Sequence, residues 1–332
     1  MPPATASHAF ERLAEPFRRE LQVHCYRLLG SLHEAEDLVQ ETYLRAWRTF
    51  DRFEGDAVRA WLYRIATNAC LNALERRERA PRLLPDQLGP ASGRVPLGAP
   101  ATDLAWLEPH PDLDGAADAA PGPEARYSSR EAVRLAFVAT LQELPPRQRA
   151  VLMLCDVLGW AAGEAAVLLD ASTASVTSAL QRARETLSRR FPNGQRPAEQ
   201  PPSEAQQRLL QRYLQAWEAH DADGLGALLK EDASLLMPPW RQWYRGREAI
   251  RSFFQERWTT CAGLRLVPTR ANAQPAFAVY QQGADGRFAA HSLQVLALEG
   301  GEIATLTLFL EPGLVPAFGL PPVLPERVGS VR

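Results

Sequence analysis

The chain has 332 residues, 37 basic and 39 acidic side chains, and a formal net charge of −2. This length exceeds one ordinary domain, so we expect two or three. The near-neutral total excludes a uniformly basic nucleic-acid-binding protein. Residues 128–196 nevertheless hold nine basic and six acidic side chains, and such a local excess is typical of a nucleic-acid-binding surface. The sequence shows no signal peptide and no apolar run of membrane-spanning length, which predicts a cytoplasmic protein that does not contact a membrane.

The four cysteines are distant from one another and form no CxxC pair: Cys25, Cys70, Cys155 and Cys261. Each stands in an apolar or helical context, which predicts buried, reduced thiols. We therefore expect no metal site and no cofactor.

Residues 8–80 show a helical hydrophobic period. Gly30 and the stretch 53–56 interrupt it. In the last part, Trp61, Ile65 and Ala69 are expected to form one apolar stripe, which makes Trp61 a core residue.

Residues 81–127 differ in composition from what precedes them. They contain nine prolines and seven acidic against three basic side chains, which predicts an acidic, proline-rich linker without a core of its own. The segment DLAWLEPHPD, residues 103–112, is an exception because it places a Trp and two Leu in a polar tether. An incidental aromatic is one interpretation; we favour an anchor that packs on another surface.

Residues 128–191 are predicted to be helical, and a short linker, 192–202, follows. GEAAVLLD forms a short helix, ASTA a tight turn, and a second helix begins at Ser172 or Thr173, either of which can cap it. On that helix one apolar stripe is expected: Val176, Leu180, Ala183 and Leu187. This pattern predicts a helix-turn-helix whose second helix reads DNA, since small hydroxyls allow close approach and Arg and Gln supply donors. An ordinary amphipathic helix with a solvated basic face is the alternative.

The C-terminal segment, 203–320, changes type. We expect helices at 203–220, 222–230 and 246–259, and then β-strands within 264–270, 276–282, 288–301 and 302–312. EGGE between the last two strands is a hairpin signal. Helices followed by a meander predict an α+β domain whose sheet curls around its helices.

Four motifs occur in a fixed order: EAEDLVQETYLRAW (34–47), AWLYRIATNACLNALERR (60–77), LQELPPRQRAVLMLCDVLGW (141–160) and SALQRARETL (178–187). Together they resemble regions 2 and 4 of an extracytoplasmic function (ECF) sigma factor of the sigma-70 family. The resemblance implies a multidomain protein: an all-α region 2 bundle at 8–80, a Pro-rich linker at 81–127, an all-α region 4 helix-turn-helix at 128–191, and an α+β domain after it. It also implies binding to core RNA polymerase, through the β′ coiled coil and the β subunit, and to promoter DNA.

The resemblance implies a role for three groups of residues, carried over by position. Those expected to bind core polymerase are Asp37, Leu38, Gln40, Glu41 and Arg45. Those expected at the −10 element are Arg59, Arg64, Asn68, Asn72, Arg76 and Arg77. Those expected at the −35 element are Ser172, Thr173, Ser175, Thr177, Ser178, Gln181, Arg182 and Arg184.

The segment from Leu209 to Pro239 and GREAIRSFF (246–254) resemble the SnoaL-like, or ketosteroid-isomerase-like, cone. Tyr213 falls where isomerases of this fold place a catalytic tyrosine. Their general base aligns with Met237, which cannot accept a proton, so we expect no enzyme of that kind. The residues considered for a pocket are Tyr213, Trp217, Met237, Trp240, Asn272 and His291. They are expected either to fill the core or to hold a small ligand.

The sequence thus favours a sigma factor that directs promoter-specific initiation and is regulated by a fused SnoaL-like domain. It leaves open whether that domain inhibits or activates. Two alternatives belong to other classes: a helix-turn-helix regulator that never touches polymerase, and an enzyme whose activity lies in the cone.

Overall fold

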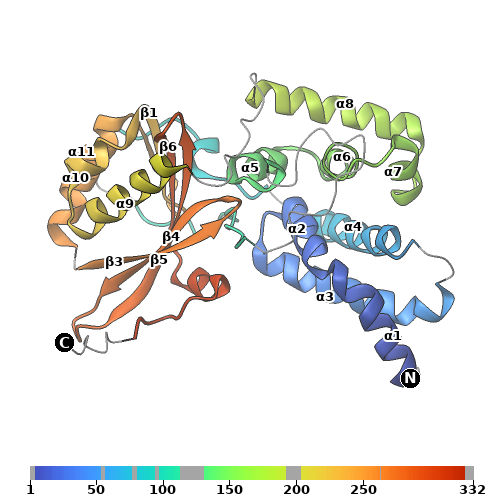
Figure 1. Cartoon of the computed structure of the whole chain (residues 1–332). Coiled ribbons are helices and arrows are strands. Elements are labelled where there is room, and N and C mark those ends of the chain that lie inside the picture. The colour runs from blue at the N-terminus through green and yellow to red at the C-terminus, as the bar shows by residue number, and fades with distance from the viewer. Residues whose placement is uncertain are drawn as a thin grey trace. The chain divides into compact units, whose positions relative to one another are not determined.

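The computed structural model describes residues 4–53, 57–76, 81–93, 97–112, 131–191, 203–261 and 263–325. Contacts divide the chain into two compact units (Figure 1). The first contains Met1–Arg82 and Asp112–Ala198, and the second contains Leu83–Pro111 and Glu199–Arg332. Each unit is discontinuous in sequence because the segment expected to be a free linker is divided between them.

The first unit is helical. Its N-terminal half contains α1 (Ala4–Ala14), α2 (Arg18–Leu29), α3 (Leu32–Thr49) and α4 (Val58–Arg76). Gly30 ends α2 with a left-handed φ of 69°, and the Ser31 hydroxyl caps α3 by accepting a hydrogen bond from the Glu34 amide at 3.3 Å. The two helices consequently reverse direction within two residues.

The predicted stripe of α4 is only partly its buried face. Ala69 is fully buried, as are Leu62 and Ala66, which we expect to extend the apolar side, whereas Trp61 and Ile65 are only partly buried. The expectation that Trp61 is a core residue is therefore wrong: its indole stacks on the Phe53 ring, with centroids 4.5 Å apart, at the margin of the bundle. The buried face is wider than one stripe because α4 packs against both α2 and α3.

The C-terminal half of the first unit contains α5 (Leu135–Glu143), α6 (Pro146–Leu152), a π-helical turn (Met153–Val157), α7 (Ala162–Leu168) and α8 (Thr173–Arg190). The four apolar residues predicted for the core stripe of α8 are all buried. Asp170 takes a left-handed φ of 49° between α7 and α8, which an Asp tolerates better than most residues. This half has the predicted helix-turn-helix form.

The second unit is the predicted α+β domain. Its sheet has the order β2-β1-β6-β5-β4-β3, and only β1 and β6 run parallel. The strands are β1 (Leu229–Leu236), β2 (Trp243–Arg245), β3 (Leu264–Ala271), β4 (Gln274–Gln282), β5 (Phe288–Glu299) and β6 (Glu302–Phe309). The helices are α9 (Glu204–Glu218), α10 (Ala222–Gly226) and α11 (Arg247–Arg257). Gly300 and Gly301, both at positive φ, form the predicted hairpin.

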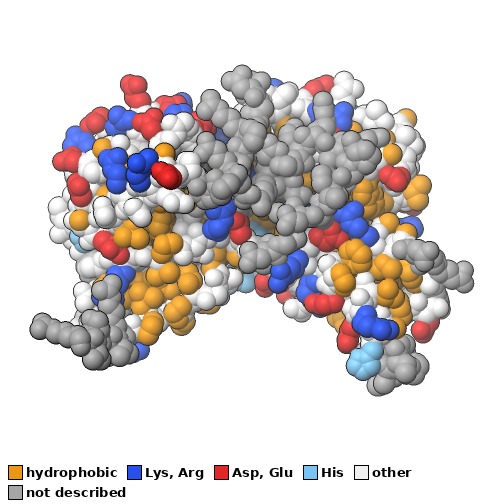
Figure 2. Space-filling view, viewed as in Figure 1, with side chains coloured by type: hydrophobic (Ala, Val, Ile, Leu, Met, Phe, Trp, Pro, Cys, Tyr) orange, Lys and Arg blue, Asp and Glu red, His pale blue; other side chains and the backbone are white. Residues whose placement is uncertain are grey.

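The core of this unit lies between the three helices and one face of the sheet. Tyr213, Trp217 and Phe254 of the helices pack there with Phe277 and Leu296 of the strands. On the face drawn in Figure 2, apolar side chains also gather over the sheet towards the C-terminus of the chain. Tyr213 and Trp217, which we expect either to fill the core or to hold a ligand, thus lie in the core.

Two sequence-based expectations are wrong in this unit. The helix expected over 222–230 ends at Gly226, and β1 begins at Leu229. The expectation that the linker has no packing of its own also fails before residue 103: Leu84 is buried, and Leu83 pairs with Trp106 in a parallel bridge. Within 103–112, where we favour an anchor, Leu107 and His110 are buried. Residues 113–127 lie outside the described residues.

Candidate nucleic-acid and polymerase interfaces

The outer face of α8 carries the polar side chains that the sequence assigned to DNA. Seven of the eight are exposed: Ser172, Thr173, Ser175, Thr177, Ser178, Gln181 and Arg182. The Ser172 hydroxyl accepts a hydrogen bond from the Ser175 amide at 3.2 Å, so Ser172 is also the N-cap. Because the opposite face of α8 is buried, this polar face is presented outward along most of the helix.

Arg184, the eighth candidate, is held within the protein. It pairs with the buried carboxylate of Asp156, with N–O distances of 2.6 and 2.9 Å. Glu185, which sequence reasoning did not include, is exposed and accepts a hydrogen bond from the Gln181 amide at 3.2 Å. Its spacing of four residues from Gln181 was the available signal. The outer face of α8 therefore combines hydroxyls, Arg182 and an amide–carboxylate pair.

The −10 candidates lie on α4 in different settings. Arg64, Asn72 and Arg76 are exposed, and Asn68 is partly buried. Arg77 lies outside the described residues. These exposed side chains supply one cationic and amide-bearing face of α4.

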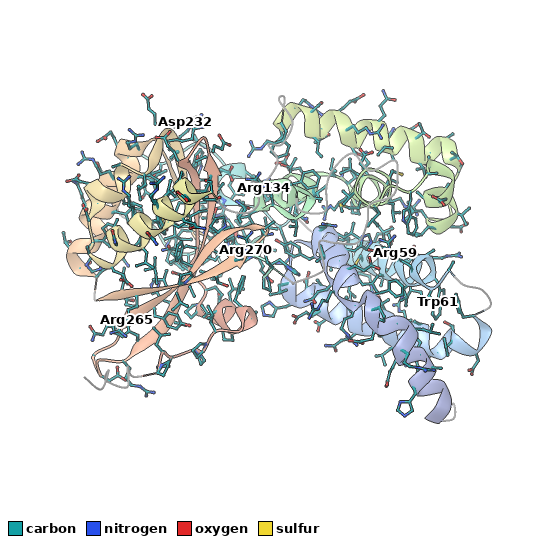
Figure 3. All side chains as sticks on the ribbon, in the orientation of Figure 1. Arg59, Trp61, Arg134, Asp232, Arg265 and Arg270 are labelled. Atoms are coloured by element: carbon teal, nitrogen blue, oxygen red, sulfur yellow. The ribbon has the colours of Figure 1, made fainter. Side chains whose placement is uncertain are left out.

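Arg59, also on α4 and labelled in Figure 3, is already engaged. Its guanidinium donates to the Glu20 carboxylate at 3.1 Å and lies 5.1 Å from the centre of the Tyr63 ring. It is therefore less available to nucleic acid than Arg64.

A depression of about 500 Å³ lies between α3 and α4. Arg45, Asn72, Glu75 and Arg76 line it. It brings one residue predicted to bind polymerase together with two residues predicted to bind the −10 element. The two predicted surfaces are thus continuous at this point.

The polymerase candidates on α3 do not all face outward. Asp37 and Gln40 are exposed, whereas Leu38 is only 9% exposed and packs in the bundle. Leu38 therefore lies in the bundle core and not on the outer face of α3. Leu44, which is not among the predicted residues, is 58% exposed and lies seven residues, or two turns, after Asp37 on the same face. Glu41 and Arg45, both partly buried, form an i,i+4 ion pair beside it.

The six residues considered for a pocket in the second unit do not form one. Tyr213, Trp217 and Met237 share the buried core. Trp240 lies on the loop after β1, and Asn272 forms the turn between β3 and β4 with a φ of 55°. His291 is a partly buried residue of β5. Sequence reasoning grouped residues of similar chemistry that the topology separates.

Tyr213 is tied to a residue that the sequence did not reveal. Its hydroxyl donates to Gln294 Oε1 at 2.6 Å, and both side chains are fully buried. Burial raises the pKa of Tyr213 well above its usual value, against a smaller opposing effect of the Trp217 indole. The phenol is therefore neutral near pH 7. Gln294 lies between Leu293 and Val295 in β5, and this polar residue in an apolar strand is the one feature of the sequence that could have indicated its role.

The segment 83–111 is docked on the loop between β1 and β2. The indole N–H of Trp240 donates to the Gly98 carbonyl at 2.7 Å, and that of Trp243 donates to the Gly89 carbonyl at 2.9 Å. Arg241, between them, pairs with Asp103 at 2.6 Å. Two of these three contacts are made to backbone carbonyls of the segment. We call the described part of this segment, residues 83–93 and 97–111, the docked tether.

The DLAWLEPHPD stretch fastens the other end of the docked tether. The Asn272 amide donates to the His110 carbonyl, and the His110 amide donates back to Asn272 Oδ1, each at 2.9 Å. Pro111 forms a β-bridge with Ala271 beside this pair. Trp106 donates its indole N–H to the Ala101 carbonyl at 3.1 Å, which holds the stretch against the preceding turn.

Within the described ranges, no group of three or more His, Cys, Asp or Glu side chains could hold a metal ion. Among those residues, no helix is both long and apolar enough to cross a membrane.

Comparison with known proteins shows a match for all three segments. Residues 13–80 match Sigma-70 region 2, residues 134–187 match Sigma-70, region 4, and residues 210–306 match the SnoaL-like domain. ECF RNA polymerase sigma factor SigG of Mycobacterium tuberculosis is 45% identical over 318 residues, which cover 94% of this chain and 84% of that protein.

Two further comparisons are narrower in what they support. ECF RNA polymerase sigma factor SigE of Mycolicibacterium smegmatis is 34% identical over 163 residues, 49% of this chain and 53% of that protein. The crystal structure of the Mycobacterium tuberculosis extracytoplasmic function sigma factor SigJ superposes with a TM-score of 0.61, covers 95% of this chain and 100% of that one, and at 22% identity supports the fold alone. With 45% identity over nearly its whole length, the chain belongs to the ECF RNA polymerase sigma factors.

Proposed function

We propose that this sigma factor binds core polymerase through the outer face of α3, engages the −10 element through α4 and reads the −35 element through the outer face of α8. The proposal is carried by the division of α8 into a fully buried apolar stripe and an exposed face of hydroxyl, amide and guanidinium groups. Such a face suits major-groove recognition, in which short polar side chains permit close approach. Its site of action is then the cytoplasm, where core polymerase works.

On α3, the outer face combines Asp37, Gln40 and the exposed apolar Leu44. An apolar side chain surrounded by polar ones is a common anchor at protein–protein interfaces. On α4, Arg64 and Arg76 offer cations and Asn72 an amide to a single strand. The α3 surface thus suits a protein partner and the α4 surface suits nucleic acid, and both are what a sigma factor requires.

Run-off transcription with purified core polymerase tests the assignment. The full chain should direct transcripts from a cognate promoter, and Asp37→Ala combined with Gln40→Ala should abolish both core binding and transcription. Glu36→Ala is the matched control, because this exposed carboxylate of α3 accepts a hydrogen bond from Gln22 of α2. A regulator that never touches polymerase would lose nothing in the double variant, and that result would reject the proposal.

We also propose that the SnoaL-like unit regulates initiation by retaining the docked tether. The contacts of Trp240, Arg241 and Trp243 support this idea because they engage the stretch that joins regions 2 and 4 in sequence. Trp240→Phe with Trp243→Phe removes both indole donors and keeps the aromatic rings. The double variant should change run-off output from the same promoter, and unchanged output would remove the regulatory role.

We propose further that this unit is not an enzyme of the isomerase type. Tyr213 directs its hydroxyl to Gln294, and Met237 is a buried thioether that offers no base. The full chain should give no turnover of a β,γ-unsaturated ketone. Turnover that is lost in Tyr213→Phe would contradict this.

A further inference from the structure

We propose that Glu185 of α8 is a positioning residue in −35 recognition: it fixes the orientation of the Gln181 amide, and the two side chains together select a base that carries an exocyclic amino group, adenine or cytosine. This assignment rests on the proposed reading of the −35 element by α8. It adds the kind of base that the helix selects and the residue that controls the selection. We call Gln181 and Glu185 the amide–carboxylate pair.

The amide–carboxylate pair lies at the centre of the outer face of α8. Ser178, Gln181 and Glu185 are all exposed, and spacings of three and four residues place them in one row. Successive residues of an α-helix are rotated by about 100°, so this row lies opposite the buried stripe that begins at Val176 and ends at Leu187. A helix that docks on DNA with its outer face therefore directs this row towards the bases.

The chemistry of the pair allows one orientation of the Gln181 amide. Gln181 Nε2 donates to Glu185 Oε1 at 3.2 Å, and within the described part of the chain this is the one hydrogen bond of either side chain. A carboxylate only accepts hydrogen bonds, whereas an amide has a donor end and an acceptor end. Turning the amide over would place two acceptor oxygens against each other. Glu185 therefore holds the Nε2 end and leaves Gln181 Oε1 for a partner outside the protein.

The Glu185 carboxylate is not neutralised by a neighbouring arginine. Arg184 pairs with Asp156, and Arg189 donates to the Glu185 backbone carbonyl at 3.3 Å and to the Thr186 hydroxyl at 3.4 Å. A negative charge on a surface that meets DNA phosphates is unfavourable by itself. A hydrogen bond from a base to the carboxylate offsets this cost, and the place of Glu185 in the row that faces the bases permits such a bond.

The atoms that remain available on the pair are acceptors that match amino groups. Gln181 Oε1 and Glu185 Oε2 are both free to accept. In the major groove, adenine presents its N6 amino group and cytosine its N4 amino group, whereas guanine and thymine present the oxygens O6 and O4. An amino group can donate to either oxygen of the pair. A guanine or thymine oxygen would instead face a carboxylate, and neither could donate to the other.

Loss of the Glu185 carboxylate should thus change base preference more than affinity. Glu185→Ala frees the Gln181 amide to turn, so that its donor end can reach O6 of guanine or O4 of thymine. It also removes a negative charge that repels phosphates. A carboxylate that only supported the helix would affect all promoter sequences equally. Both side chains are exposed, so neither alanine substitution removes a core contact.

Transcription of a promoter library by the holoenzyme tests the assignment. Core polymerase with the full chain transcribes promoters in which each −35 position carries all four bases in turn, and sequencing gives the output for each base. Gln181→Ala identifies the base pair that this side chain reads, because the preference there is lost. At the same base pair, Glu185→Ala should reduce the preference of the wild type about tenfold without lowering the mean output of the library.

Deletion of the amino group tests the chemistry directly. The preferred base pair contains adenine or cytosine on one strand, and replacement by purine or by 2-pyrimidinone, respectively, removes only the exocyclic amino group. This change should lower the output of the wild type about tenfold. The double variant, Gln181→Ala with Glu185→Ala, should lose much less, and it also corrects for the weaker base pairing of the modified duplex.

The matched control is Glu231→Ala, which deletes an exposed carboxylate of β1 in the second unit and should leave every −35 preference unchanged. The assignment is overturned if Gln181→Ala relaxes no position, if Glu185→Ala leaves the preference at the Gln181 base pair intact, or if amino-group deletion affects the wild type and the double variant equally. A wild-type holoenzyme that transcribes equally from every −35 sequence would instead overturn the proposed function of α8, and this assignment with it.

Discussion

Arg184 and Asp156 form a two-pronged ion pair that ties α8 to the π-helical turn before α7. The Nε–Oδ2 distance is 2.9 Å and the Nη2–Oδ1 distance is 2.6 Å. The Asp156 side chain is 1% exposed and that of Arg184 39% exposed. A side chain that its position assigned to DNA therefore supports the helix that carries the other candidates.

Arg184→Ala should destabilise the protein, because it leaves a buried carboxylate without its main partner. We expect a loss of about 1–3 kcal/mol, below the usual cost for a fully buried pair since Arg184 is partly solvated. Urea denaturation of the full chain measures this loss.

Arg182→Ala is the comparison, because Arg182 is exposed on the same helix. It should change stability by less than about 0.5 kcal/mol and weaken binding to −35 DNA. The slope of the logarithm of the binding constant against the logarithm of the salt concentration should become shallower by about 1. Equal destabilisation by both variants would show that the ion pair does not distinguish the two arginines.

The helices of the first unit could be predicted because apolar residues repeat at the helical period, and glycine and capping residues indicate where helices end. Which side of each helix is buried could not always be predicted. Leu38 and Leu44 are both leucines of one helix, yet one is in the core and the other is exposed. Their difference depends on which helices pack against α3, and that is a tertiary property.

Strand β1 was missed because its sequence is locally polar. Lys230, Glu231 and Asp232 interrupt the apolar alternation, and Lys230 forms an ion pair with Glu299 of β5 at 2.8 Å. Propensity cannot anticipate a partner 69 residues away. The docking of the tether could not be predicted for a similar reason. Trp240 and Trp243 bind backbone carbonyls of the tether, and every residue has a carbonyl, so the sequence does not identify the acceptors.

Leu44→Ala should weaken binding to core polymerase by about tenfold or more while leaving stability within about 0.5 kcal/mol, because an exposed apolar side chain costs little to truncate unless a partner covers it. Leu38→Ala should do the reverse and cost about 2–4 kcal/mol as a core truncation. Fluorescence anisotropy with labelled chain and unlabelled core measures affinity, and urea denaturation measures stability. Unchanged core affinity in Leu44→Ala would exclude Leu44 from the interface.

Trp240→Phe with Trp243→Phe should release the docked tether. The amides of Ala101 and Ser92 donate to the Pro239 and Trp243 carbonyls, at 2.9 and 2.7 Å, so both should exchange slowly with solvent while the tether is docked. Hydrogen exchange followed by mass spectrometry should show faster exchange of peptides within 89–103 in the double variant, because the two indole donors to this segment have been removed. Peptides from β4 and β5 are the internal control and should not change. Unaltered exchange in 89–103 would mean that the indole donors do not hold the tether.

The stability of the protein should fall in mild acid because of His24. Burial, with smaller contributions from Arg27 and Arg59, lowers the pKa of His24 from 6.5 to about 3. Its ring packs edge-on against Tyr63, and its Nε2 lies 2.9 Å from the Thr67 hydroxyl, so the folded protein holds the neutral imidazole. The unfolded chain binds a proton below pH 6.5 and the folded chain only near pH 3. Stability is therefore fully present above pH 6.5 and decreases as the pH falls towards 3.

At pH 5 this group alone should cost about 2 kcal/mol relative to pH 7.5. Urea denaturation at both pH values measures the difference in the wild-type chain and in His24→Gln, in which the contribution should disappear whatever the variant's absolute stability. His33→Gln, at an exposed position of α3, is the control for replacing a histidine with glutamine. An identical dependence on pH in the wild type and in His24→Gln would show that the unfolded and folded chains protonate this imidazole alike, and that the burial of His24 against Tyr63 does not suppress its charge.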